Sequence, residues 1–131
     1  MKHIIAVLIG LILFGTLSGC ATVEPTIFTP KNAFDFYFNI SSVPDDAEVY
    51  INDRLFGRTP CKFPLTVSFI TQPGLGFTYY PRENYVLRVS KDGYRDNITQ
   101  IIFYSDSCMG PSLKPGEPAK EGTYNFNLEK K

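Results

Sequence analysis

The chain has 131 residues, and its 13 lysine and arginine side chains balance its 13 aspartate and glutamate side chains. The charges are interspersed with no run of one sign, which excludes the basic patches typical of nucleic-acid binding. Eleven phenylalanines, eight tyrosines and no tryptophan, with ten prolines and ten glycines, favour short strands over long helices. We therefore expect a single all-β domain.

The N-terminus has the pattern of an export signal. Met1-Lys2-His3 supplies a short positive start, and residues 4–17 are mostly apolar. A membrane-spanning helix needs about 20 apolar residues, and this run ends sooner, against Gly19. We therefore predict a signal peptide over residues 1–19.

The signal ends in Leu17-Ser18-Gly19-Cys20. This tetrad resembles the lipobox of bacterial lipoproteins, and the resemblance implies that Cys20 carries a diacylglyceryl group and further acylation such as palmitate. Two or more acyl chains anchor a protein stably in a membrane. Ala21, where an aspartate would retain such a protein in the inner membrane, favours the outer membrane if the source has two. The alternative is an uncleaved anchor helix with an incidental cysteine.

Residues 20–33 are expected to form the lipidated N-terminus and an extended tether, since Pro25 and Pro30 interrupt a segment without periodicity. The β-domain then covers residues 34–131.

Alternation of apolar and polar residues predicts six strands. They cover residues 34–41, 47–52, 62–69, 85–90, 97–104 and 124–128. Six or seven short strands separated by turn signals indicate a small antiparallel β-sandwich. Pro64 cannot donate to a ladder, so we expect its strand to lie at a sheet edge.

Two linkers exceed ordinary hairpin length, at residues 71–84 and 105–122. The first contains an aromatic run, and its candidate binding residues are Phe77, Tyr79, Tyr80 and Arg82. These side chains could present a flat platform to sugar rings or to a protein partner. The alternative is that they fold back and plug an open end of the sandwich. The second linker is expected to meander over the surface.

Three short motifs follow one another in a fixed order: residues 42–53, then Gly57-Arg58-Thr59-Pro60, then Lys91-Asp92-Gly93-Tyr94. Each motif is a turn tied to a strand. Asn52-Asp53 is a turn pair that tolerates positive φ, and Gly57 can adopt left-handed geometry without cost. Gly93 is expected to serve a turn that points Tyr94 back onto the sheet.

This order of motifs resembles the PEGA domain, a small β-domain of bacterial surface proteins, over residues 36–104. The chain departs from the family pattern at Asp45, Asp46 and Asp53, two of which replace glycine. Aspartate accepts left-handed geometry better than most residues, so the turns can survive. The resemblance implies a sandwich fold and a non-catalytic role in attachment or interaction, and it supplies no ligand residues.

The chemistry of the exported chain is limited, because its only histidine is His3 of the signal. Triads built on imidazole and histidine-ligated zinc sites are excluded. Cys61 and Cys108 are predicted to form a disulfide in an oxidising compartment, the alternative being two separate thiols. We expect no cofactor and no metal.

Carboxylates are the remaining candidates for chemistry. They form two pairs, Asp45 with Asp46 and Asp92 with Asp96, and Asn97 next to Asp96 would complete a calcium-like set. Adjacent carboxylates in tight turns more often solvate a loop, and this spacing lacks the alternating ligands of a calcium loop. We expect solvated turns.

The leading hypothesis is a non-catalytic, membrane-anchored envelope lipoprotein whose β-sandwich is a protein-interaction or structural module. The alternative is a glycan- or peptidoglycan-binding lipoprotein that uses residues 77–82. An enzyme, or a small inhibitor of one, is a third reading.

Overall fold

The structure, a computed structural model, describes residues 32–74, 76–106 and 109–131. The signal, Cys20, most of the tether and Cys108 lie outside these ranges. The described part is all-β and contains no helix that could cross a bilayer. Its eight strands are β1 (Ala33–Val43), β2 (Glu48–Ile51), β3 (Arg54–Arg58), β4 (Cys61–Pro73), β5 (Phe77–Pro81), β6 (Tyr85–Ser90), β7 (Asn97–Ile101) and β8 (Glu121–Asn127).

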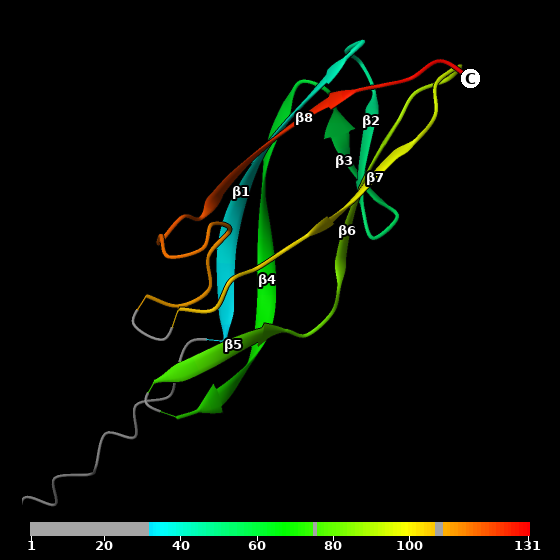
Figure 1. Ribbon diagram of the computed structural model, residues 1–131. Coiled ribbons are helices and arrows are strands. Elements are labelled where there is room, and N and C mark those ends of the chain that lie inside the picture. The colour runs from blue at the N-terminus through cyan, green and yellow to red at the C-terminus, as the bar shows by residue number, and fades with distance from the viewer. Residues whose placement is uncertain (1–31, 75, 107–108) are drawn as a thin grey trace, which may run out of the picture.

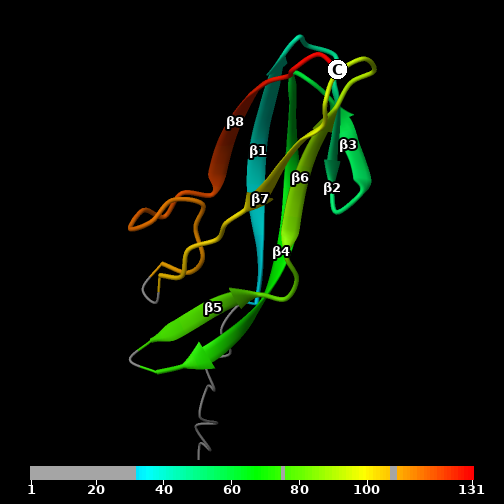
Figure 2. The same cartoon turned by 45° about the vertical axis from the view of Figure 1, so that its right-hand side comes forward.

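The strands form two four-stranded sheets, ordered β5-β4-β1-β8 and β3-β2-β6-β7. The two sheets pack against each other along the length of the molecule (Figure 1, Figure 2). The buried core lies between them and takes every second residue of the long strands. It includes Phe36, Phe38, Ile40, Val49, Ile51, Phe63, Val67, Phe69, Tyr85, Leu87, Val89, Ile101 and Phe126. The expected sandwich and its inward faces are thus confirmed.

One strand pair departs from the antiparallel expectation. β8 pairs with β1 in parallel, with Tyr37 opposite Glu121 and Val43 opposite Asn127. A parallel pair needs a long crossover, and the connection from residue 102 to residue 120 provides it. Alternation of side chains carries no information about strand direction, which is why the prediction was wrong here.

Two strands were not predicted, so the described chain has eight rather than six or seven. In β3 only Phe56 and Gly57 are partly buried, and they are adjacent. Apolar and polar residues therefore do not alternate enough for the strand to be recognised from the sequence. β5 was interpreted as a loop because prolines and glycines bracket it, whereas β4 continues to Pro73 and forms a hairpin with β5. β7 is shorter than predicted, since it ends at Ile101.

The turns have the backbone conformations that the sequence predicts, with one exception. Asn52 and Asp53 both have positive φ, 48° and 62°, and join β2 to β3 by a two-residue hairpin loop. Asp46 has a φ of 58°, so aspartate does replace glycine at the turn that marks the PEGA motif. Gly57 is the exception. It has no positive φ and lies inside β3 opposite Val49, with its Cα facing Cys61.

The third motif behaves as expected, with Gly93 at a φ of 81° and Tyr94 packed against the core. Pro64 is not on an edge strand, because β4 lies between β5 and β1. However, β5 pairs only with residues 69–73 of β4, so one side of Pro64 has no ladder partner among the described strands. Where the structure describes residues 105–120, they form none of the eight strands, as predicted, but they do not stay on the surface, because Pro111 and Ser112 are buried.

Candidate binding surface

The predicted aromatic platform does not form one surface. Successive side chains of β5 point to opposite faces of its sheet. Tyr79 points inward, where its ring centroid lies 5.6 Å from that of Phe34 and 6.3 Å from that of Phe69. Tyr80 points outward and is 50% exposed. Half of the aromatic run therefore plugs the end of the sandwich, as the alternative interpretation expected.

The other two candidates, Phe77 and Arg82, also lie on different sides. Phe77 is half-buried and shares the inward side with Tyr79, while Arg82 is exposed just beyond β5, where its N–H donates to the carbonyl oxygen of Ser68 at 3.0 Å. Of the four residues, only Tyr80 and Arg82 remain accessible to a ligand on the outer face.

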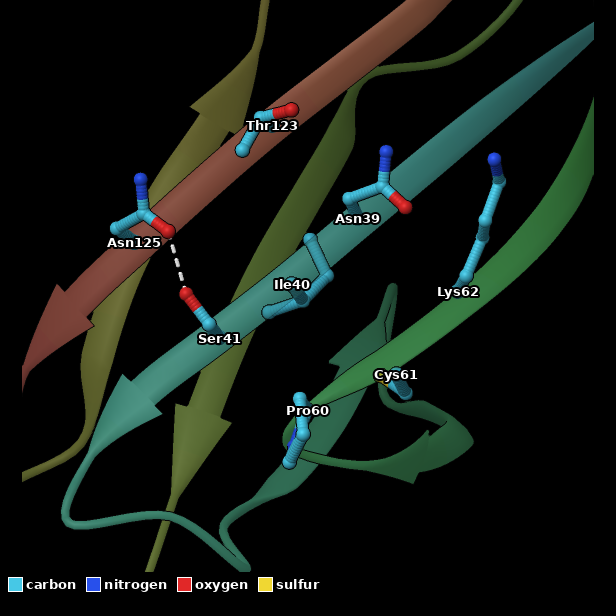
Figure 3. Close-up of a pocket in the computed structure, with 8 residues that line it drawn as sticks. All are labelled: Asn39, Ile40, Ser41, Pro60, Cys61, Lys62, Thr123 and Asn125. Carbon is cyan, nitrogen blue, oxygen red and sulfur yellow. Dashed lines mark hydrogen bonds between the residues drawn. The ribbon is translucent and has the colours of Figure 1, made fainter.

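A shallow hollow lies on the outer face of the same sheet, toward the end of β1, and is lined by both polar and apolar residues (Figure 3). Its volume is about 330 Å³. Three adjacent strands contribute the polar side chains, which project from one side of the sheet in Figure 3. The polar ones are Asn39 and Ser41 of β1, Lys62 of β4, and Thr123 and Asn125 of β8. Ile40, Pro60 and Cys61 complete the lining.

The register explains why these residues meet. Asn39 of β1 lies opposite Lys62 on one side and opposite Thr123 on the other, and Ser41 lies opposite Asn125. The Ser41 hydroxyl donates to the amide oxygen of Asn125, which leaves the amide nitrogen of Asn125 directed elsewhere (Figure 3). Neutral amides and hydroxyls on a nearly flat face suit a ligand rich in hydroxyl groups. Tyr37, 42% exposed two residues before Asn39, adds an aromatic ring to this face.

Cys61 is a free, half-buried thiol at the start of β4, opposite Ile40. Burial raises the pKa of this thiol, which makes it a poor nucleophile at neutral pH. The described part of the chain holds no disulfide, and Cys108 lies outside it. The Cys61–Cys108 disulfide therefore stays a prediction.

The outer face of the second sheet differs, since its charges neutralise one another. Arg58 pairs with Asp46 and with Glu48, each at 3.1 Å. Arg88 pairs with Asp53 at 3.5 Å, and its guanidinium lies 4.1 Å from the centre of the Tyr50 ring. Exposed ion pairs of this kind contribute little to stability.

One carboxylate of each predicted pair, Asp46 in the first and Asp96 in the second, belongs to the same network. Asp96 accepts a hydrogen bond from the Ser90 hydroxyl at 2.7 Å and pairs with Arg88 at 3.4 Å. Asp92 is exposed in the turn before Gly93. Among the described residues, no group of three acidic, cysteine or histidine side chains is placed to hold a metal ion.

We expect the Tyr50→Phe substitution to raise the pKa of Glu48. The Tyr50 hydroxyl donates to a Glu48 carboxylate oxygen at 2.6 Å, and this hydrogen bond, with the nearby charge of Arg58, lowers the pKa of Glu48. Because the pKa of Glu48 is lower in the folded chain than in the unfolded chain, its ionised carboxylate stabilises the fold at pH values above the unfolded-state pKa. This stabilisation is lost as the pH falls through the folded-state pKa. NMR titration of the Glu48 side chain measures the change.

The matched control is Tyr37→Phe, which removes a tyrosine hydroxyl from the other sheet and should leave the Glu48 titration unchanged. An unchanged pKa in Tyr50→Phe would show that the hydrogen bond does not control Glu48.

Sequence reasoning missed the residues of the hollow. Alternation already put Asn39 and Lys62 on the outward side of their strands, so their orientation was predictable. What the sequence did not reveal was that β8 lies beside β1, which brings Thr123 and Asn125 to them. A search for amide and hydroxyl side chains on outward positions would have found the candidates but not their proximity.

Comparison with known proteins identifies one similarity. The family model of the PEGA domain matches residues 37–68, which run from β1 through β2 and β3 into β4. The matched stretch contains the first two motifs, whereas Lys91–Tyr94 lies beyond it. No curated protein and no solved structure matches the chain.

Proposed function

We propose that this protein is a non-catalytic envelope lipoprotein, held by lipid on Cys20, whose sandwich serves as an interaction or structural module. The observation that carries the anchor is the Leu17-Ser18-Gly19-Cys20 tetrad at the end of the apolar run. The PEGA match supports the module. The absence of histidine after residue 3 supports a role without catalysis. Ala21 favours the outer membrane where the source has two membranes.

Labelled palmitate should be incorporated by the wild-type chain and not by Cys20→Ala, because the acylated residue is lost. Labelling of cells that express the full chain, followed by isolation of the protein and detection of the label, measures this. Cys61→Ala is the matched control and should keep its label, because Cys61 lies within the sandwich. Absence of label in the wild type, or its persistence in Cys20→Ala, would overturn the anchor.

The second candidate function is binding of a cell-wall glycan, and the hollow on the outer sheet face favours it. Asn39, Thr123 and Asn125 offer amide and hydroxyl groups to sugar hydroxyls, and Tyr37 offers a ring face (Figure 3). This site replaces the predicted platform at residues 77–82, of which Tyr80 is the accessible aromatic residue. Tyr79 supports the core and is unsuitable for a binding test.

If the hollow binds glycan, Asn39→Ala combined with Thr123→Ala should reduce retention on purified sacculi about tenfold. Two lost hydrogen bonds of about 0.7 kcal/mol each give that factor. The control combines Asn84→Ala with Thr78→Ala, the same residue types at exposed positions outside the hollow. No retention of the wild type, or equal retention of both double variants, would count against glycan binding.

A further inference from the structure

The two sheets have four edge strands, and three of them are protected against pairing with another chain. β3 carries Arg54 and Arg58 at its ends and contains a bulge at Phe56, which has no partner residue in β2. β5 ends in a proline, Pro81. β8 begins with Glu121 and Gly122, and Leu113 from the preceding segment covers Gly122. Charges, prolines, bulges and covering segments are the usual means of protecting sheet edges.

Between Asn97 and Ile101, the fourth edge strand, β7, has none of these features, although just beyond it Tyr104 and Ser112 exchange two backbone hydrogen bonds at 2.9 Å. Its sequence, Asn-Ile-Thr-Gln-Ile, contains no charge, no proline and no glycine. The C-terminal segment pairs with the chain just before β7, where the Arg95 N–H donates to the Glu129 carbonyl oxygen at 2.8 Å. Within the described residues, no strand pairs with the outer side of β7.

The ladder shows which backbone groups of β7 face outward. Val86 of β6 lies opposite Gln100, yet its backbone groups bond on the other side, to Asn52. In an antiparallel ladder, opposite residues either exchange both hydrogen bonds or point both sets of groups away. The N–H and C=O of Gln100 therefore face the free edge, and so do those of Ile98, two residues earlier.

The outward side chains at this edge form a row that reads the same in both directions. Ile98, Gln100 and Ile102 share one face, and the two isoleucines are 62% and 57% exposed. A second copy placed antiparallel, with a two-fold axis at Gln100, would put Ile98 opposite Ile102 of that copy. Both apolar side chains would then gain a partner, and no like charges would meet across this row.

We propose that β7 is a self-pairing edge, which joins two copies of this chain into one eight-stranded sheet with Gln100 on the two-fold axis. The Gln100 pair exchanges two backbone hydrogen bonds, and each Ile98–Ile102 pair can add two more. An edge contact of this length buries less than the roughly 1,200 Å² of a stable complex, so the dimer is transient. This inference goes beyond the proposed function and does not depend on the lipid anchor.

The test is disulfide trapping in intact cells that express the full chain. In the paired state the two Gln100 Cα atoms lie about 5.5 Å apart, which is within disulfide range. Gln100→Cys should therefore give at least about fivefold more covalent dimer on mild oxidation than the wild-type chain. Val86→Cys is the matched control, on the same face one strand inward. Its two copies would be three strand spacings apart, about 14 Å, which is too far to bond.

A second variant tests the contact itself. Adding Ile98→Lys to Gln100→Cys should reduce the dimer to the wild-type background, because a charge replaces the apolar contact with Ile102. Adding Ile70→Lys instead should leave the dimer intact, since Ile70 is similarly exposed, at 54%, but lies on a central strand of the other sheet. The proposal is overturned if Gln100→Cys yields no more dimer than Val86→Cys, or if its adducts contain a different protein.

Discussion

Phe36→Ala should lower the free energy of unfolding by about 3–5 kcal/mol, the range for a large aromatic side chain removed from a core. The Phe36 side chain is fully buried between the sheets. Its ring centroid lies 4.9 Å from that of Phe103 and 6.1 Å from that of Phe69, so a cavity would open beside these two rings. Small domains are stable by only about 5–15 kcal/mol, and the variant should be close to unfolding. Urea denaturation followed by circular dichroism measures the loss.

The neighbouring position provides the control. Tyr37→Ala removes an aromatic side chain from the same strand, but Tyr37 faces outward, and the expected loss is well under about 1 kcal/mol. Similar losses in both variants would show that β1 does not separate a core face from a solvent face.

Thr59→Val should cost about 2–3 kcal/mol, although the side chain keeps its size. Thr59 is buried, and its hydroxyl oxygen accepts a hydrogen bond from the Ala47 N–H at 3.0 Å. The Ser42 hydroxyl donates to the Pro44 carbonyl oxygen at 2.7 Å, so the proton between Ser42 and Thr59, whose oxygens lie 2.5 Å apart, comes from Thr59. Valine would leave the buried Ala47 N–H without this acceptor and break the chain of bonds that holds the first motif.

Thr66→Val is the matched control, because Thr66 donates to Asp35 at 2.6 Å on the exposed face. Its replacement should change stability by less than about 0.5 kcal/mol. If Thr59→Val were as mild as Thr66→Val under the same urea titration, the hydroxyl chain would not stabilise the motif.

Backbone hydrogen bonds with Thr59 hold the turn of the first motif, in which Asp46 has a positive φ. Asp46 adopts positive φ, which costs about 1 kcal/mol or more for a residue with a side chain. The backbone N–H of Asp46 donates to the Thr59 carbonyl oxygen, and the Thr59 N–H donates to that of Ala47, both at 2.8 Å. The second motif thus fixes the first, which is a physical reason for the two motifs to occur together.

Side-chain alternation predicted the core well, because a strand between two layers must bury every second residue. Phe36, Phe38 and Ile40 on β1, and Leu87 and Val89 on β6, are buried as expected. The same signal failed for β5, where Pro73, Gly74, Gly76 and Pro81 indicated a loop and the hairpin geometry overrode them.

The candidate site was less accessible to prediction, because it depends on which strands are neighbours. Nothing in the local sequence of β8 indicates that it joins β1 in parallel, yet that pairing assembles the hollow of Figure 3. The self-pairing edge depends likewise on β7 being the last strand of its sheet. Local pattern determines which side chains face outward, and only the topology determines which of them are brought together.

The position of Ala33, where β1 begins, determines how far from a membrane the sandwich could extend. β1 starts at the end of the sandwich that carries the β5 hairpin, and the hollow lies about 20 Å further along the same strand (Figure 1). The eleven residues between Cys20 and Asn32 allow these two residues to lie at most about 40 Å apart. With acyl chains on Cys20, the end of the sandwich that carries the β5 hairpin would stay within about 40 Å of the lipid headgroups. The hollow could then contact a ligand up to about 60 Å above them.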